Sequence, residues 1–285
     1  MKNHPSISRR RFIQTGAGSL AALGAAQLPW RLFAAPAQDP FRGMKLGVAS
    51  YSFRKFTLEQ AIAMTVELGL KYISLKSFHL DLKATPAQVR EARRKIEAAG
   101  LVLLGGGVIT IPPKEEEVRA IFEYAKGAGM PTIVCSPVPA GLDIVEKMVV
   151  EYNIRIAIHN HGPGDKYYPL PLDAWRMVEN RDKRMGICID VGHTVRIGGD
   201  PIAAIKRCAS RLYDFHLKDV TAAIPAGKHC VFGKGVIDFP HVLQTLLDVK
   251  FSGHLEMEYE DTPDDPLPGM KESVAYLRKV FATLT

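Results

Sequence analysis

The sequence has few of the features that mark disulfide-stabilised, zinc-binding or membrane proteins. Its four cysteines form no CxxC pair, and Cys135 and Cys188 lie inside apolar runs, where buried free thiols are common. We therefore expect no disulfide framework, although a Cys208–Cys230 bridge stays open. After the N-terminal region, no segment has the roughly 20 consecutive apolar residues that a membrane span requires.

The net charge of +7 does not indicate a nucleic-acid-binding surface. Residues 1–37 hold five of the 37 basic residues and none of the 30 acidic ones, so the remaining chain has 32 against 30, a net charge of +2. A nucleic-acid surface requires clustered basic residues. The sequence also lacks a glycine-rich phosphate loop after the first strand and an evident arginine cluster, which disfavours dinucleotide and sugar phosphate ligands.

The first 37 residues have the successive parts of a cleavable twin-arginine export signal. Residues 8–14 read SRRRFIQ, residues 20–28 are apolar, and Ala35-Pro36-Ala37 is a small-x-small cleavage motif. Such signals are removed from the mature protein. We expect a periplasmic protein of residues 38–285, with no membrane partner in the mature form. The alternative is a basic amphipathic N-terminal helix.

Strand-like and helix-like segments alternate along residues 38–285, which favours a parallel α/β architecture. Roughly 248 residues is a typical length for a (β/α)8 barrel. We therefore expect a single TIM barrel, with an open doubly wound sheet as the alternative. The expected strands are 45–52, 72–76, 101–108, 132–136, 154–159, 185–190, 212–216 and 255–258. The expected helices are 57–69, 86–99, 114–127, 142–152, 172–180, 201–210, 239–249 and 270–282.

The last four expected strands each end in a metal-binding or proton-transferring side chain, namely His159, Asp190, His216 and Glu258. In a barrel these ends meet at one mouth. Residues alternate between the two faces of a strand, and the apolar face must pack against the helices, so all four side chains point inward. Two imidazoles and two carboxylates suit Mn, Fe, Co, Ni or Zn better than Ca or Mg. The pattern predicts one divalent metal.

The same alternation puts three further charged residues inside the barrel. Arg155, Asp214 and Glu256 share the inward parity and lie deeper than the strand ends. Unpaired buried charge is costly. We therefore expect these three side chains to neutralise one another beneath the metal.

Three short motifs stand at the strand ends, namely Asp190-Val-Gly-His193, His216-Leu-Lys218-Asp219 and Glu258-Tyr259. They resemble motifs of the xylose isomerase-like TIM barrel superfamily, which includes the sugar phosphate isomerase/epimerase family. The resemblance covers nearly all of residues 38–285. It implies a metal held by Glu, Asp, His and Glu from the last four strands. Asp190, His216 and Glu258 match three of these ligands, and the first Glu is replaced by a histidine at position 159.

The resemblance implies an isomerase or epimerase that abstracts a proton beside the carbonyl of a sugar or keto-sugar. Glu258 is the expected base, and His193 and Lys218 would supply a proton or polarise a substrate oxygen. Related epimerases exchange the proton between two Glu residues, whereas a metal-bound His159 has no free lone pair for that role. The histidine at position 159 therefore favours proton abstraction from one side of the substrate only. The alternative function is a lyase or hydratase acting on 3-keto-glycosides. A non-catalytic carbohydrate-binding protein also stays open.

Four further residues are candidate substrate contacts. Lys76 ends the second strand with inward parity and would bind a substrate oxygen, neutralise an acid or lie on the surface. Tyr51 and His79 would line a sugar pocket or pack in the core. His161 would replace His159 as ligand, act as base or cap the following turn. The expected partner is a sugar or keto-glycoside, and the sequence leaves a homo-oligomer open.

Overall fold

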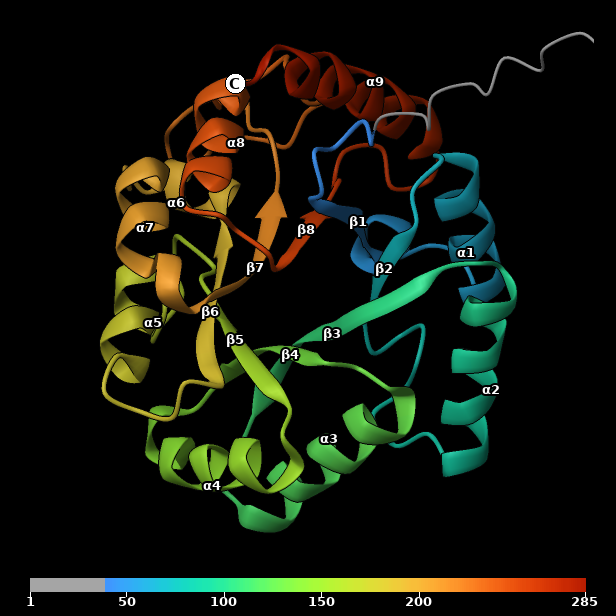
Figure 1. Ribbon diagram of the computed structural model, residues 1–285, viewed down its shortest axis with the longest axis vertical. Helices are drawn as coiled ribbons and strands as arrows, with labels where there is room; N and C mark the ends of the chain where they lie inside the picture. Colours follow the sequence, from blue (N-terminus) through green and yellow to red (C-terminus); the bar gives the residue numbers. More distant parts are fainter. Residues whose placement is uncertain (1–38) are drawn as a thin grey trace, which may run out of the picture. The chain divides into compact units, whose positions relative to one another are not determined.

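The computed structural model of the protein describes residues 39–285, in which eight parallel strands close into one barrel surrounded by helices (Figure 1). Each strand pairs with the next one along the chain, and the pairing of β1 with β8 closes the ring. The strands are β1 (Lys45–Ala49), β2 (Tyr72–Leu75), β3 (Val102–Ile111), β4 (Thr132–Pro137), β5 (Arg155–His159), β6 (Met185–Asp190), β7 (Leu212–Leu217) and β8 (His254–Met257).

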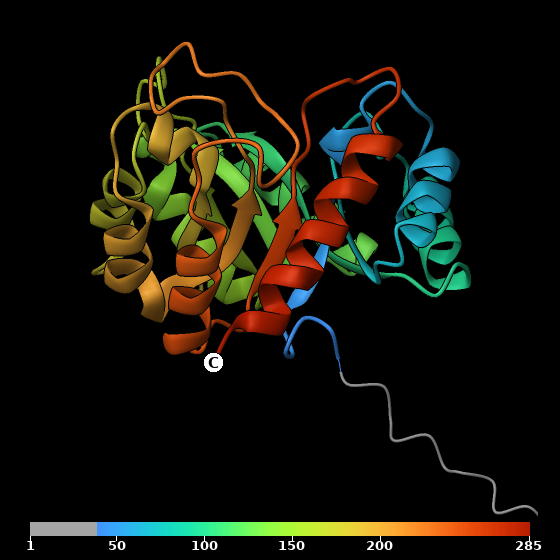
Figure 2. The same cartoon turned by 90° about the horizontal axis from the view of Figure 1, so that it is seen from above.

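The helices connect successive strands on the outside of the barrel. Figure 2 shows β7 and β8 pointing toward the side where the long loop between β7 and α8 lies. The helices are η1 (Ser50–Phe53), α1 (Leu58–Glu67), α2 (Pro86–Ala98), α3 (Glu115–Ala128), η2 (Pro139–Gly141), α4 (Leu142–Tyr152), α5 (Pro171–Val178), α6 (Val191–Arg196), α7 (Pro201–Cys208), η3 (Ala209–Arg211), α8 (Phe239–Asp248) and α9 (Leu267–Thr283).

The expected TIM barrel is confirmed, and the open sheet is wrong. Helix α4 and strand β6 have the expected bounds, and the other expected segments differ by a few residues at their ends. Helix α6 and the three short 3-10 helices were not predicted from the sequence, because elements of three to six residues show too little periodicity. The export signal expected over residues 1–37 lies outside the described residues.

Two helices begin at the threonines that the sequence indicates. The Thr57 side chain accepts a hydrogen bond from the backbone N–H of Gln60, and the Gln60 side chain accepts one from the N–H of Thr57. Thr85 and Gln88 form the same reciprocal pair at the start of α2. These bonds satisfy N–H groups that have no partner within the helix.

The predicted alternation of inward and outward residues is confirmed in the barrel. The outward-facing Ile156 and Ile187 belong to the large apolar core that the strands share with the helices. Val134, Ala157 and Cys188 instead form a separate small cluster. The strand ends therefore stand above a barrel interior that is largely closed by side chains.

Arg155 does not neutralise the buried carboxylates, so that prediction is wrong. It is the first residue of β5, is exposed, and holds its guanidinium 5.1 Å from the centre of the Tyr213 ring. Arg155 lies four residues before His159, or roughly 13 Å along an extended strand. Asp214 lies only two residues before His216. The carboxylates contact histidine and serine side chains instead, as described below.

All four cysteines are free. The Cys208–Cys230 bridge that the sequence left open is therefore not formed. Within residues 39–285, no helix combines the length and the apolar character needed to cross a membrane.

Candidate metal centre

The ends of β5 to β8 bring four buried donor atoms together, which we call the quartet: His159 Nε2, Asp190 Oδ2, His216 Nδ1 and Glu258 Oε2. His159 Nε2 lies 3.2 Å from His216 Nδ1 and 3.4 Å from Asp190 Oδ2. His216 Nδ1 lies 2.9 Å from Glu258 Oε2 and 4.0 Å from Asp190 Oδ2. Metal bonds of about 2.0–2.2 Å separate tetrahedral ligands by roughly 3.3–3.6 Å. The quartet therefore fits one divalent metal.

The two carboxylate oxygens of Asp190 have different contacts. Its Oδ1 accepts a hydrogen bond from the backbone N–H of His193 at 2.8 Å and so caps α6. Its Oδ2 is buried and accepts no hydrogen bond. The contacts of Oδ2 are to the Lys218 ammonium, with Nζ at 3.0 Å, and to the imidazole of His159, with Nε2 at 3.4 Å. A buried carboxylate oxygen that accepts no hydrogen bond has a lone pair available for a metal ion.

Glu258 lies just after β8, where backbone and side-chain bonds extend the barrel. The N–H of Glu258 donates to the carbonyl of Leu217 at 3.0 Å. Ser52 donates to the carbonyl of Met257 and accepts from the N–H of Tyr259 at 2.9 Å. These bonds hold Glu258 beside the other three ligands.

Lys218 is a buried cation among three carboxylates. Its Nζ lies 3.0 Å from Asp190 Oδ2, 2.9 Å from Glu258 Oε2 and 2.5 Å from Glu260 Oε1. It also lies 3.3 Å from His193 Nε2. Burial alone would lower the pKa of Lys218, but the three carboxylates outweigh it and hold the pKa well above its usual value. Lys218 is therefore charged and offsets part of the negative charge of the three carboxylates at the mouth of the barrel.

The same contacts set the charge of the ligands. Burial alone would raise the pKa of Asp190 and of Glu258, but the Lys218 ammonium outweighs it and holds both pKa values well below their usual range. Burial lowers the pKa of His159 well below its usual value. Burial also lowers the pKa of His193 to about 4. Burial alone would lower the pKa of His216, but its neighbours, including Cys188 and Glu258, outweigh burial and hold this pKa well above its usual value. Because divalent metals bind carboxylates and neutral imidazoles, metal binding would displace the proton on His216 Nδ1.

A cavity of about 300 Å³ opens above the quartet. It brings together all but one of the candidate catalytic and substrate residues with two of the metal ligands. Its lining consists of Tyr51, Lys76, Val108, His159, His161, His193, Arg196, Lys218, His229, Glu258 and Glu260.

Lys76 is a cavity residue rather than a surface lysine. Its Nζ donates to the carbonyl of Val108 at 3.3 Å and lies 5.6 Å from the centre of the Tyr51 ring. Burial lowers the pKa of Lys76. The structure thus places a cation and an aromatic face at one wall of the cavity.

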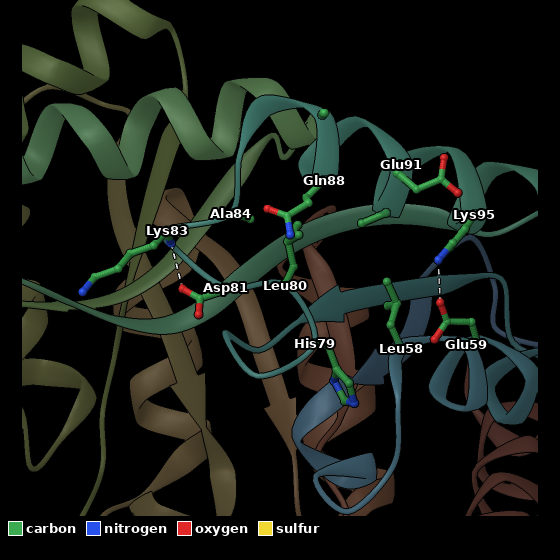
Figure 3. Close-up of a pocket in the computed structure, with 12 residues that line it drawn as sticks. Leu58, Glu59, His79, Leu80, Asp81, Lys83, Ala84, Gln88, Glu91 and Lys95 are labelled. Atoms are coloured by element: carbon green, nitrogen blue, oxygen red, sulfur yellow. Dashed lines mark hydrogen bonds and ion pairs between the residues drawn. The ribbon is translucent and has the colours of Figure 1, made fainter.

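His79 is not at the mouth of the barrel. It lines a separate and larger groove of about 670 Å³ between α1 and α2, shown in Figure 3 with Leu58 and the Lys95–Glu59 ion pair. Its Nδ1 lies 2.8 Å from Ser50 Oγ and its Nε2 lies 3.1 Å from the carbonyl oxygen of Phe56. Both ring nitrogens thus have structural partners. Despite its size, this groove is not our candidate site, because the metal-binding donors converge elsewhere.

His161 stands beside the quartet without joining it. Its ring centre lies 4.5 Å from that of His159, and its Nδ1 lies 3.3 Å from Asp165 Oδ2. Its backbone N–H donates to the carbonyl of Tyr168. His161 therefore does not replace His159 as ligand, and its side chain stays a candidate substrate contact.

Three polar residues that line the cavity were not predicted from the sequence, namely Arg196, His229 and Glu260. Glu260 shares the inward parity of Glu258, which was a usable signal. His229 comes from the loop between β7 and α8, where no periodicity identifies it. Asp219 organises that loop, because its side chain accepts hydrogen bonds from the N–H groups of Gly233 and Gly235 at 2.8 and 3.0 Å.

Comparisons with known proteins agree with the barrel fold. A family model described as xylose isomerase-like TIM barrel matches residues 41–280. The rhizopine catabolism protein MocC of Rhizobium meliloti is 30% identical over 141 residues, which cover 44% of this chain and 42% of MocC. This chain thus spans less than half the length of MocC. An inosose dehydratase of Bacillus cereus (strain AH820) is 25% identical over 236 residues, which cover 76% of this chain and 70% of the enzyme.

A solved structure extends the comparison to the fold. The 3-keto-D-glucoside 4-epimerase YcjR of E. coli superposes with a TM-score of 0.67 and 17% identity, covering 83% of this chain and 99% of YcjR. At this identity the likeness shows a shared barrel.

Proposed function

Because this chain belongs to the xylose isomerase-like TIM barrel family, we propose that it is a metal-dependent sugar isomerase or epimerase. The reaction begins with removal of a proton beside the carbonyl of a sugar or keto-sugar. The observation that carries this proposal is the convergence of His159, Asp190, His216 and Glu258 beside a cavity that His159 and Glu258 line. A divalent Mn, Fe, Co or Zn ion held there would act as a Lewis acid toward a substrate carbonyl.

The remaining chemistry falls to side chains of the cavity. Glu258 is the proposed base, because it is ionised and lines the cavity. Lys218 holds its ammonium 2.9 Å from Glu258 Oε2, where it stabilises negative charge on a substrate oxygen. With a pKa of about 4, His193 is neutral at pH 7 and donates or accepts a hydrogen bond to a substrate hydroxyl.

The size of the cavity limits the substrate. Ligand pockets span roughly 300–1,000 Å³, and this one, at about 300 Å³, is at the lower end. One sugar ring fits such a space, and a larger substituent would extend toward the rim. The substrate class we propose is therefore a monosaccharide, or a glycoside that inserts only its keto-sugar ring.

His159 favours a second candidate reaction, the elimination of an aglycone or water from a 3-keto-glycoside or a related keto-sugar. His159 occupies the place of the carboxylate that would exchange the proton on the opposite side, and its Nε2 faces the quartet. A base on one side suffices for elimination. The similarity to a protein named inosose dehydratase supports this alternative.

Incubation of the metal-loaded protein with 3-keto-glucosides and free ketoses in D2O, followed by NMR, tests both reactions. Deuterium beside the carbonyl of an intact glycoside supports isomerisation or epimerisation. Release of the aglycone supports elimination. Asp190→Asn is the matched control, because the amide oxygen can still cap α6 while the ligand charge is lost. If metal-loaded wild-type protein gives neither product, proton abstraction on these substrates is wrong.

Metal content separates these enzymes from a non-catalytic carbohydrate-binding protein. We expect purified protein to hold close to one divalent ion per chain, or to gain thermal stability when Mn, Co or Zn is added. Absence of both effects would favour the binding protein. We also propose export to the periplasm by the twin-arginine route. An Arg9→Lys, Arg10→Lys variant should remain in the cytoplasmic fraction, and unchanged fractionation would contradict export.

A further inference from the structure

A second group of buried polar side chains lies directly beneath the quartet, inside the barrel. The ring of His216 connects the two groups, because its Nδ1 belongs to the quartet and its Nε2 points the other way. His216 Nε2 lies 3.5 Å from Asp214 Oδ1 and 3.5 Å from Glu256 Oε2. All three side chains are at most 3% exposed.

Each carboxylate has a second contact with a side chain of another strand. His254 Nδ1 lies 3.1 Å from Asp214 Oδ2. Ser74 on β2 donates to Glu256 Oε2 at 2.5 Å. The five side chains His254, Asp214, His216, Glu256 and Ser74 thus form a belt, which we call the interior belt. Two buried carboxylates are costly unless they are paired or hydrogen-bonded, so each of them needs a donor such as the N–H of His216.

The role of the two carboxylates follows from the two nitrogens of His216. When Nδ1 binds a metal, the proton of the neutral ring must be on Nε2. In the described structure Nε2 is buried and has no hydrogen bond of good geometry to any other group. Asp214 Oδ1 and Glu256 Oε2 each lie 3.5 Å from it. A carboxylate that accepts the second ring N–H of a ligand histidine fixes the tautomer and orientation of the ring and strengthens its metal bond.

We propose that Asp214 and Glu256 are positioning residues that jointly accept the Nε2 proton of His216 and hold its Nδ1 toward the metal. His254 and Ser74 hold the two carboxylates in place. The proposal rests on the metal quartet of the proposed function, but on no particular sugar reaction. It assigns a role to residues that touch neither substrate nor metal.

A second cation is the competing occupant of this space. Asp214, His216 and Glu256 offer three donor atoms within 4.8 Å of one another, and Glu256 Oε1 is buried without a hydrogen bond. Such a cation would require His216 to lose both ring protons, because the imidazole would bridge two metals. Asp214 Oδ1 already has Cys188 Sγ as a donor at 3.4 Å. We therefore favour a proton on His216 Nε2 over a second cation. The number of metal ions bound per chain distinguishes the two.

The test uses the full chain loaded with Co²⁺ and does not depend on turnover. Proton NMR of the Co²⁺ protein should show exchangeable, strongly shifted N–H resonances of the ligand histidines, which disappear in D2O. In Asp214→Asn and Glu256→Gln the His216 resonance should move or vanish, and Co²⁺ affinity should fall about 10–100-fold. Tyr124→Phe is the control, because it loses a buried hydrogen bond to Leu80 far from the site.

Four other outcomes are informative. Wild-type affinity and an unchanged resonance in both variants would overturn the positioning role. Two Co²⁺ ions per wild-type chain, with one lost in Asp214→Asn, would replace it by a second metal site. If the variants fail to fold, Ser74→Ala disturbs only the support of Glu256 and should still shift the resonance, and no shift overturns the proposal. A wild-type protein that shows the resonance but converts no sugar keeps this inference and refutes only the proposed reaction.

Discussion

Replacing Lys218 by methionine tests the charge balance of the metal centre. Methionine keeps much of the length of the side chain but removes the ammonium that contacts Asp190, Glu258 and Glu260 at 2.5–3.0 Å. Lys218 and Asp190 are almost fully buried. Removing one partner of a buried ion pair costs about 3–5 kcal/mol, because the remaining charge has no compensation. We expect the free energy of unfolding of the metal-free protein to fall by that amount.

Metal binding should respond in the opposite direction. In the metal-free protein Lys218 supplies the positive charge that a divalent ion would otherwise supply to Asp190 and Glu258. Without this ammonium the two carboxylates gain more from the ion, so K218M should bind Co²⁺ or Zn²⁺ more tightly than wild type. Saturating metal should therefore restore part of the lost stability.

Urea denaturation with and without metal measures both effects, and isothermal titration gives the affinity. The matched control is Lys271→Met, because Lys271 forms an ion pair with Glu67 in which both side chains are about half exposed. Exposed pairs contribute about 0–1 kcal/mol. Equal metal-free stabilities of K218M and K271M would refute the buried-charge argument. Weaker metal binding by K218M would refute the idea that the ammonium and the metal share the same carboxylates.

Three shorter predictions follow from other parts of the structure. Removing the metal with a chelator should lower the melting temperature, since a ligand at about 1,000 times its Kd stabilises by about 4 kcal/mol; Asp190→Asn should show no such difference in a thermal scan. In the folded protein only the partly exposed Cys230 should react with a thiol reagent, slowly because burial raises its pKa to about 11, whereas Cys135 and Cys208 should react only after unfolding. Thr85→Ala should lower the free energy of unfolding in urea by about 1 kcal/mol through loss of the α2 cap, and Thr85→Ser should not. The cysteine prediction is contradicted if Cys135 or Cys208 in the folded protein reacts at the rate of Cys230. The capping prediction is contradicted if the alanine and serine variants of Thr85 are equally stable.

The convergence of the metal quartet was predictable because it depends on two local regularities. Side chains alternate along each strand, and parallel strands of a barrel end at the same face. His159, Asp190, His216 and Glu258 follow both rules. The error with Arg155 has the same origin, because parity tells the face of a strand but not the depth. Depth depends on how far along its strand a residue stands, and four residues place Arg155 at the opposite end of the barrel.

Longer-range contacts were not predictable. His79 has a residue type suited to a sugar pocket, but the turn after β2 directs it to Ser50 and Phe56 in a different groove. His229 reaches the cavity because Asp219 folds the long loop after β7 by accepting hydrogen bonds from Gly233 and Gly235. Neither outcome leaves a periodic trace in the sequence.

The sequence by itself determined the barrel, the order of its strands and the identity of the four donor side chains of the quartet, because these follow from periodicity and from chemistry at strand ends. Only the tertiary structure decided what surrounds those side chains. It placed the Lys218 ammonium among three carboxylates and set Asp214 and Glu256 against the far side of His216. Both results depend on contacts between side chains of different strands, and the charge of Lys218, Asp190 and Glu258 follows from ionic neighbours that outweigh burial.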